Sequence, residues 1–581
     1  MQLEAKLFSA LKQAFLTLYH LNIEGEISPI QVTRKEFQGN FSIPLFPYFK
    51  RCKEEPMHLA EKIGEWMQKH TDLVASYNVI SGFLNLVIRD SIWLAILKAI
   101  KGDLTYGCLA RKNSKVVIEF SCPNTNKPQH LGHLRNNFLG SALAAILEAA
   151  GYSVVKVNLI NDRGIHICKS MVAYAQFGEG ETPESSGIKG DHLVGKYYVK
   201  FEQLYKEQCA TPLPPIVQTA QKMLLAWEKG DPAVIALWKK MNGWVYEGFK
   251  ETYERLGITF DRVYYESDTY LLGKAVVEEG LARKIFYRKE EGAIAVDLAT
   301  YGLGEKVLLR NDGTAIYITQ DLGTADLRYT DYHFDKMIYV VGDEQAYHFK
   351  VLFAIMETLG RPYAAAMYHL SYGMVNLPDG KMKSREGTVV DADQLVAEMV
   401  QTVKSYTEDA QKIEGLNAQA LQQLYDVLAI GALKFFLLRV APAKKIIFNP
   451  SESIDFQGDT ATFIQYTYAR ICSLMRKAQA MGQAAAIDGN LSLNPLEQSI
   501  ILQLALFPSQ VEAAAQSYMP SIIANYVLEL AKIYNKFYAS YPILRVTDAS
   551  LSSFRLFLSS CVAQVLQKSM ELLTITLPEK M

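Results

Sequence analysis

The segment from Lys115 to Ile160 restricts the possible folds more than any other part of this sequence. It contains a short apolar run, VVIEF, a turn rich in proline and asparagine, the helical pattern LRNNFLGSALAAILEAAGY, and a second apolar run, VVKVNLI. A strand, a helix and a strand in this order form a right-handed crossover, which places both strands parallel in one sheet. The segment therefore predicts a multidomain α/β protein built on a Rossmann-type doubly wound parallel sheet.

The length of 581 residues exceeds a single ordinary core and predicts several domains. Residues 1–112 are expected to form a small N-terminal α/β domain. Residues 113–395 are expected to form the Rossmann-type domain, with an insertion at about 172–300. Residues 396–581 consist almost entirely of amphipathic helical patterns and predict an all-helical bundle.

Two histidines, His130 and His133, lie where the first strand turns into its helix. A helix that follows a parallel strand directs its N-terminal amides towards the carboxyl edge of the sheet, where phosphates bind. The two rings share one face of the first turn, and Gly132 between them lets a flat nucleotide approach the backbone. The pattern indicates a site that stabilises charge developing on a phosphate. Taken alone, so short a pattern is equally typical of capping or packing groups, or of half a metal site.

A second element, NLPDGKMKSREGTVV at 376–390, carries Lys381, Lys383 and Arg385 after an Asp-Gly turn. In an extended loop these alternate cations face one side. Such a loop can close over a triphosphate and neutralise the leaving pyrophosphate. Considered alone, a solvated basic loop is the better explanation.

Together the two elements resemble the HIGH and KMSKS motifs of class I aminoacyl-tRNA synthetases, in the same order and separated by an insertion. Ser384 stands where KMSKS has its second lysine. Arginyl-tRNA synthetases commonly lack that lysine, and the lysine just before HIGH is thought to replace it; Lys127 occupies this position. Along the whole chain, the sequence resembles that family in the blocks EFSCPNTNKPQHLGHLRN, NDRG, NDGTAIYITQDLGTA, VVGDEQAYHF, QYTYARICSLMRKA and LPEKM.

A guanidinium group needs carboxylates that accept paired hydrogen bonds. Glu119 ends the first predicted strand, and Tyr317 and Asp321 share one face if a helix begins there. Each of these residues also has an ordinary explanation, as a surface charge, a core residue or a helix cap.

The resemblance implies three sets of residues around the reaction. The expected catalytic residues are Lys127, His130, His133, Lys381, Lys383 and Arg385. The expected ATP contacts are His130, Gly132, His133, His348, Met374, Val375 and Met382. The expected arginine contacts are Glu119, Ser121, Asn124, His133, Tyr317, Asp321 and Gln345, with Asn124 and Gln345 at the α-amino and carboxylate end.

The resemblance also implies that the N-terminal domain grips the elbow of tRNA(Arg) and that the helical bundle reads its anticodon. The formal net charge of −1 requires the attraction to come from local basic patches. Of Tyr466 and Tyr468, we expect one to be exposed and the other buried. The expected RNA contacts are Phe37, Gln38, Asn40, Tyr466, Arg470 and Arg476.

The activity implied is a ligase that activates L-arginine with Mg²⁺-ATP and transfers it to the 2′-hydroxyl of the terminal adenosine of tRNA(Arg), without a protein-held metal. The nearest alternative is a class I synthetase for another amino acid, which the two acidic residues Glu119 and Asp321 argue against. An HxGH nucleotidylyltransferase could use the same phosphate chemistry but needs neither the insertion nor the bundle. A non-catalytic RNA-binding relative would typically have lost the histidines or the cationic loop.

The seven cysteines are scattered and form no CxxC pair, which favours reduced thiols and a cytoplasmic protein. The N-terminal helical pattern is interrupted by charges, unlike a signal peptide. No apolar run is judged long enough to cross a bilayer, and no membrane partner is expected. The chain is expected to be a monomer.

Overall fold

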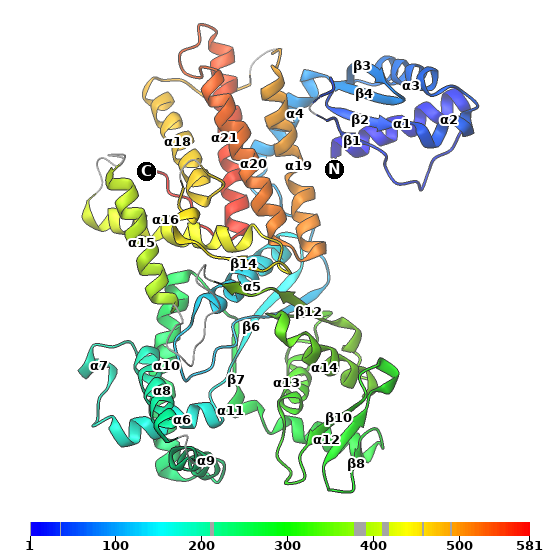
Figure 1. Cartoon of the computed structure of the whole chain (residues 1–581). Helices are drawn as coiled ribbons and strands as arrows, with labels where there is room; N and C mark the ends of the chain where they lie inside the picture. Colours follow the sequence, from blue (N-terminus) through cyan, green and yellow to red (C-terminus); the bar gives the residue numbers. More distant parts are fainter. Residues whose placement is uncertain are drawn as a thin grey trace.

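The computed structural model describes residues 2–34, 36–208, 214–376, 391–409, 417–455, 458–487 and 491–581. Four of the predicted site residues lie outside these ranges: Lys381, Met382, Lys383 and Arg385. Figure 1 shows the N-terminal domain beside the upper part of the helical bundle, and the α/β domain below the bundle.

The N-terminal domain is an antiparallel sheet covered by helices. Its strands pair in the order β1-β2-β4-β3. One of its inner strands is β4, whose Leu84, Leu86 and Ile88 are buried. The elements are α1 (Gln2–Tyr19), β1 (Gln31–Val32), β2 (Phe41–Pro44), α2 (Phe46–Cys52), α3 (Pro56–His70), β3 (Val74–Ile80) and β4 (Phe83–Ile88). The next helix, α4 (Asp90–Gly102), packs against the bundle and connects the two regions.

The central domain contains a five-stranded sheet in the order β12-β11-β5-β6-β7, and every neighbouring pair is parallel. The strands are β5 (Lys115–Glu119), β6 (Ser153–Ile160), β7 (Arg262–Tyr265), β11 (Lys336–Gly342) and β12 (Met367–Tyr372). Helix α5 (Leu131–Ala149) connects β5 to β6. The predicted strand, helix, strand unit and parallel sheet are therefore confirmed, with the near-continuous apolar strands typical of a sheet buried on both faces.

The region from 172 to 300, predicted as one insertion, is divided by β7, which adds an edge strand to the main sheet. Five helices precede β7: α6 (Ile165–Phe177), α7 (Pro183–Ser186), α8 (Gly190–Gln208), α9 (Pro215–Glu228) and α10 (Pro232–Leu256). After it come α11 (Glu266–Thr269), α12 (Leu272–Ala282), a small antiparallel sheet of β8 (Tyr287–Arg288), β9 (Ile294–Asp297) and β10 (Glu305–Leu309), and α13 (Tyr317–Tyr332). Four residues with one buried side chain are too short a pattern for β7 to be found from sequence.

The C-terminal region is helical, as predicted. Its elements are α15 (Ala392–Asp409), α16 (Ala418–Leu438), α17 (Pro450–Ser453), α18 (Ala461–Ala480), α19 (Pro495–Ser517), α20 (Pro520–Ser540) and α21 (Ala549–Leu572). The remaining elements are η1 (Ala299–Tyr301), η2 (Asp343–Gln345), α14 (Ala346–Thr358), η3 (Ala364–Ala366), β13 (Val375–Asn376) and β14 (Ile446–Ile447).

Helices α16 and α21 are, among the described residues, long and apolar enough to span a membrane by composition. The sequence-based statement that no run reaches this length is therefore wrong. In each helix 61% of the most apolar window is buried inside the protein, so burial in the bundle accounts for the composition.

Candidate active site

The strand order of the main sheet changes direction at β5. From β5 the chain adds β6 and then β7 on one side, and later adds β11 and β12 on the other. Open parallel sheets bind ligands at the carboxyl ends of the strands on either side of such a point. Glu119, the last residue of β5, lies in register with Tyr339 of β11 at this position.

His130 and His133 cap the start of α5. The N–H of Gly132 donates to His130 Nδ1 at 3.2 Å, and the N–H of His130 donates to His133 Nδ1 at 3.1 Å. The two ring centroids are 3.8 Å apart. The capping role that sequence left open is therefore present, and it fixes both rings. A Cβ on Gly132 would lie 3.1 Å from His130 Cε1, so glycine also makes room for the ring.

Both histidines are neutral at physiological pH. Burial, together with the charge of Lys127, lowers the pKa of His130 to about 3. Burial, His130 and Lys127 lower the pKa of His133 well below its usual value. Because Nδ1 of each ring accepts a backbone N–H, its single proton lies on Nε2. The pair offers two neutral Nε2–H donors beside the N-terminus of a helix, an arrangement suited to phosphate oxygens.

Arg135, two residues after His133 in α5, was missed by sequence reasoning. It is fully buried and donates to the carbonyl oxygens of Gly373, Pro442 (3.0 Å) and Lys444 (2.8 Å). The predicted ATP contacts Met374 and Val375 directly follow Gly373, and Val375 pairs with Ile446 of β14. Arg135 thus ties the segment before residue 377 to the helix that carries the histidines.

The face of α13 carries the predicted arginine contacts. The helix begins at Tyr317, which meets the condition under which Tyr317 and Asp321 share one face, and the Tyr317 side chain is 69% exposed. Asp321, one turn further, lies with its Oδ2 2.5 Å from His348 Nε2. His348, predicted as an ATP contact, therefore has an acidic partner. Gln345 is exposed at the end of η2, just before the helix that carries His348.

Glu119 is buried and forms an ion pair with Arg328, which lies two turns after Asp321 on α13. Burial alone would lower the pKa of Arg328, but the charge of Glu119 raises it. Burial and the charges of Glu119 and Asp321 raise the pKa of Tyr339, so both carboxylates act on one hydroxyl. Sequence reasoning expected Glu119 to face the substrate and did not identify its internal partner.

Two other predicted contacts, Ser121 and Asn124, lie in the loop that follows β5. Ser121 is buried, and its hydroxyl lies 2.7 Å from the hydroxyl of Tyr253 on α10. Asn124 is exposed and forms a parallel bridge with Asn161, which follows β6. The loops after the two strands are thus joined at this edge of the sheet.

Asp162 and Glu266 are acidic residues at the same edge whose roles sequence did not assign. Asp162 accepts hydrogen bonds from the backbone and hydroxyl of Ser267 at 2.8 and 2.7 Å and from Tyr246 at 2.8 Å, which fixes the start of α11. Glu266, the first residue of α11, is 6% exposed. Burial raises its pKa to about 7, and Asp162 and Asp321 add to the rise against the opposing charge of Arg163. Only the tertiary structure brings Glu266 close to Asp321.

The predicted RNA contacts of the N-terminal domain differ in their surroundings. Phe37 is 43% exposed and Gln38 is exposed. Asn40 is engaged within the protein: its Oδ1 accepts from the Ile88 N–H at 2.8 Å and its Nδ2 donates to Gln498 of the bundle at 3.3 Å. The amide of Asn40 thus has partners that sequence did not foresee.

In the bundle, Tyr466 is partly exposed and Tyr468 is buried, which agrees with the expectation that they would differ. The guanidinium of Arg470 lies 4.7 Å from the centre of the Tyr466 ring and also donates to Asn535. Arg476 donates to the carbonyl of Glu579 at 3.2 Å.

The parallel sheet, its switch point and the histidine-capped helix are typical of a class I aminoacyl-tRNA synthetase. In agreement, the family model described as "tRNA synthetases class I (R), catalytic domain" matches residues 95–449. The models of the arginyl tRNA synthetase N terminal domain and of the DALR anticodon binding domain match residues 1–88 and 464–581. The chain belongs to the arginyl-tRNA synthetase family, as its sequence motifs predicted.

Curated relatives are similar over the full length of both chains. The arginine–tRNA ligase of Amoebophilus asiaticus is 54% identical, and that of Bacteroides thetaiotaomicron is 48% identical, each with 100% of both chains covered. Among solved structures, the arginyl-tRNA synthetase of Thermus thermophilus is similar with a TM-score of 0.77 at 23% identity over 100% of both chains. That structural similarity shows the fold.

Proposed function

We propose that this protein is an ATP-dependent arginine–tRNA ligase and that the site at the β5–β11 switch point carries out both steps. In the first step, a carboxylate oxygen of arginine attacks the α-phosphorus of ATP, and pyrophosphate leaves. In the second step, the terminal 2′-hydroxyl of tRNA(Arg) attacks the arginyl carbonyl carbon, releasing AMP and a proton. No side chain becomes covalently attached, so catalysis depends on positioning and on electrostatic stabilisation.

The histidine pair carries the proposal. His130 and His133 hold their Nε2–H donors on one side through their hydrogen bonds to the backbone, next to the N-terminus of α5. These donors suit the additional negative charge on the α-phosphate in the transition state. Lys127, which acts electrostatically on both rings, contributes a positive charge to the same region. Magnesium enters with ATP as part of the substrate, and the cationic loop predicted at Lys381 completes the phosphate site.

The charge balance around α13 supports a guanidinium site. Arg328 neutralises Glu119, so the negative charge that remains near this helix belongs mainly to Asp321 and Glu266. We assign the arginine guanidinium to Asp321, with Tyr317 covering it and Glu266 adding charge behind it. Glu119 then affects arginine binding through its ion pair with Arg328, as well as through any direct contact with the substrate. Asn124 and Gln345, both exposed near this edge, suit the α-amino and carboxylate groups.

The remaining assignments follow from the family. The N-terminal domain and the bundle bind tRNA(Arg), with Phe37, Gln38 and Tyr466 as exposed or partly exposed contacts. We propose a monomeric protein that acts in the cytoplasm. Sedimentation of the full chain with and without tRNA(Arg) tests the oligomeric state.

The decisive experiment is charging of unfractionated transfer RNA with each of the twenty amino acids in turn. The proposal requires ATP-dependent charging with arginine alone. Charging with another amino acid would indicate a different class I synthetase. ATP–pyrophosphate exchange without any charging, even at saturating tRNA, would favour a nucleotidylyltransferase.

A further inference from the structure

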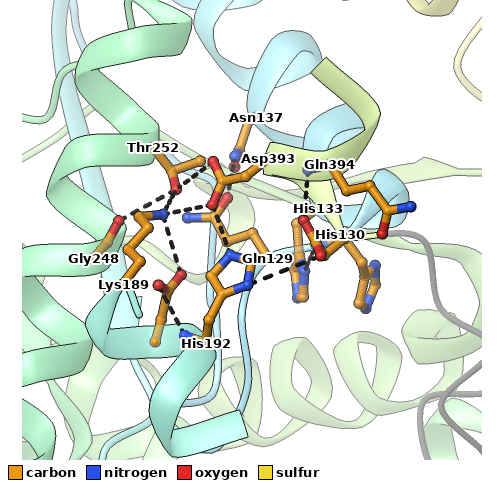
Figure 2. Close-up of polar contacts among 12 residues, drawn as sticks. Gln129, His130, His133, Asn137, Lys189, His192, Gly248, Thr252, Asp393 and Gln394 are labelled. Atoms are coloured by element: carbon orange, nitrogen blue, oxygen red, sulfur yellow. Dashed lines mark hydrogen bonds and ion pairs between the residues drawn. The ribbon is translucent and has the colours of Figure 1, made fainter. Parts of the chain in front are cut away.

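The start of α8 lies against the start of α15, next to His130 (Figure 2). Lys189 Nζ lies 2.7 Å from Asp393 Oδ2, and His192 Nε2 lies 2.9 Å from the same oxygen. One carboxylate on α15 thus receives charge-assisted hydrogen bonds from a lysine and a histidine of the helical insertion. We call Lys189, His192 and Asp393 the α8–α15 cluster.

Two further side chains enclose this cluster. Lys189 Nζ donates to Thr252 Oγ1 of α10 at 2.5 Å and to Asp191 Oδ2 at 3.4 Å. Asp191 is fully buried, and a Cβ on Gly248 would lie 2.5 Å from its Oδ1. The ligand atoms of Asp191, His192 and Asp393 lie within 4.8 Å of one another, which is close enough to hold a metal ion. The ammonium of Lys189 already lies between the two carboxylates and supplies the positive charge that a metal ion would bring.

The segment that the cluster holds is in direct contact with the histidine pair. Asp391 forms an antiparallel bridge with His130, and the Ala392 N–H donates to the Gln129 carbonyl at 2.9 Å. Asp391 Oδ2 also lies 4.0 Å from His192 Nδ1. In the sequence, Asp391 directly follows the predicted cationic element at 376–390. Asp393 therefore connects the insertion to the backbone beside His130.

Helix α8 makes a second close approach at the same place. A Cβ on Gly195 would lie 2.8 Å from Pro128 Cδ, two residues before His130. A cavity of about 230 Å³ lies between the two segments, and Lys127, His130 and His192 line it. The insertion and the phosphate side of the site thus share one cavity wall.

We propose that His192 and Lys189 are positioning residues for ATP: by holding Asp393, they fix the backbone beside His130 and so set the histidine pair against the α-phosphate. This inference rests on the proposed function. Stabilisation of transition-state charge depends on sub-ångström placement of the hydrogen-bond donors. Residues of the insertion that hold the backbone beside these donors can therefore change the reaction rate without contacting the substrate.

The charge of His192 adds a distinct signature. The hydrogen bond to Asp393 raises the pKa of His192, against the effect of burial. Burial would raise the pKa of Asp393, but hydrogen bonds from His192 and Lys189 lower it to about 2. The charged groups that face His192 are Lys189, Asp191 and Lys196 at α8, Glu251 and Arg255 of α10, Asp391 and Asp393 at α15, and Lys127 before α5. As the pH rises through the raised pKa, His192 loses its charge and its hold on Asp393 weakens.

The test measures ATP–pyrophosphate exchange by the full-length protein at saturating arginine and tRNA(Arg). His192→Ala and Asp393→Asn should each raise KM for ATP or lower kcat about tenfold, which is the factor for the loss of one hydrogen bond to a charged group at the low end of its range. The KM for arginine should stay within about twofold. The double variant should lose no more than the more impaired single variant, since both remove one interaction.

A conservative substitution separates charge from hydrogen bonding. His192→Gln keeps an N–H donor near Nε2 but cannot be protonated. It should recover part of the activity lost in His192→Ala, and its KM for ATP should change less with pH than that of the wild type.

The matched control is the Lys169–Glu202 pair, which joins α6 and α8 at 2.8 Å in the same insertion but does not contact Asp391 or Asp393. Lys169→Met and Glu202→Gln should leave the ATP parameters unchanged. The inference is wrong if the cluster variants also leave the ATP parameters unchanged. It is also wrong if the ATP parameters, the arginine parameters and the thermal midpoint of the cluster variants all shift together, since that would indicate general destabilisation. A wild-type protein without arginine-dependent exchange would instead contradict the proposed function.

Discussion

The two sides of the active site are built in different ways. The phosphate side, His130 and His133, lies within four consecutive residues, and its geometry follows from capping a single helix. The guanidinium side joins Glu119 of β5, Glu266 of α11 and Asp321 of α13, which are separated by more than a hundred residues in places.

The two sides of the active site also differ in how their charge depends on pH. Burial keeps both histidines neutral, so their donors do not change over the physiological pH range. The acidic side contains a buried ion pair and a carboxyl group with a pKa of about 7, so its charge depends on pH and on the cation that binds. Local capping thus gives a fixed donor set, whereas tertiary assembly gives an adjustable charge.

The largest expected effect comes from removing a phosphate-side donor. His133→Ala should lower kcat for arginine activation by roughly 10²–10³, the usual cost of one transition-state donor. KM for arginine should change less than about threefold. ATP–pyrophosphate exchange with tRNA(Arg) present measures kcat and KM for arginine separately. An equal loss in both would mean that His133 serves only as a helix cap.

Asp321→Asn should produce the opposite pattern. Removing the charge that faces the guanidinium should raise KM for arginine roughly tenfold to a hundredfold, since hydrogen bonds between charged groups contribute about 1.5–3 kcal/mol. KM for ATP should remain nearly constant. If KM for ATP rises instead, the contact of Asp321 with His348 has the larger functional role.

Glu266→Gln tests the adjustable charge. Because burial raises the pKa of Glu266 to about 7, arginine should bind the wild type better as the pH rises through 7, by less than about tenfold. The glutamine variant should lose this dependence. The same raised pKa means that ionisation destabilises the folded protein as the pH rises from about 4.5 to 7, so the variant should have the higher thermal midpoint at pH 8 but not at pH 4.5. Calorimetry at the two pH values provides this second measurement.

The smallest effects are expected in the N-terminal domain, where they separate RNA binding from structure. Phe37→Ala should raise KM for tRNA(Arg) about fivefold without changing the thermal midpoint, which corresponds to the low end of the roughly 1–3 kcal/mol that a side chain stacked on a base contributes. Asn40→Ala should lower the thermal midpoint, because its amide bonds Ile88 and Gln498. If an Asn40 variant had normal stability but bound tRNA(Arg) less well, Asn40 would be an RNA contact rather than a structural residue.

The sequence by itself determined the strand, helix, strand unit, the histidine pair at its turn and the family. These features depend on interactions within a few residues or on contiguous motifs, so the periodicity and the residue types are enough to predict them. The short edge strand β7 was missed because so few residues show no period.

Only the tertiary structure decided the partners of the charged residues. Arg328 pairs with Glu119, His348 with Asp321, and His192 with Asp393, and each pair joins segments distant in the sequence. A lone acidic or basic residue in a sequence has the same appearance whether it faces solvent, substrate or an internal partner. The cost of burying an unpaired charge selects among these outcomes, and it acts only once the chain has folded.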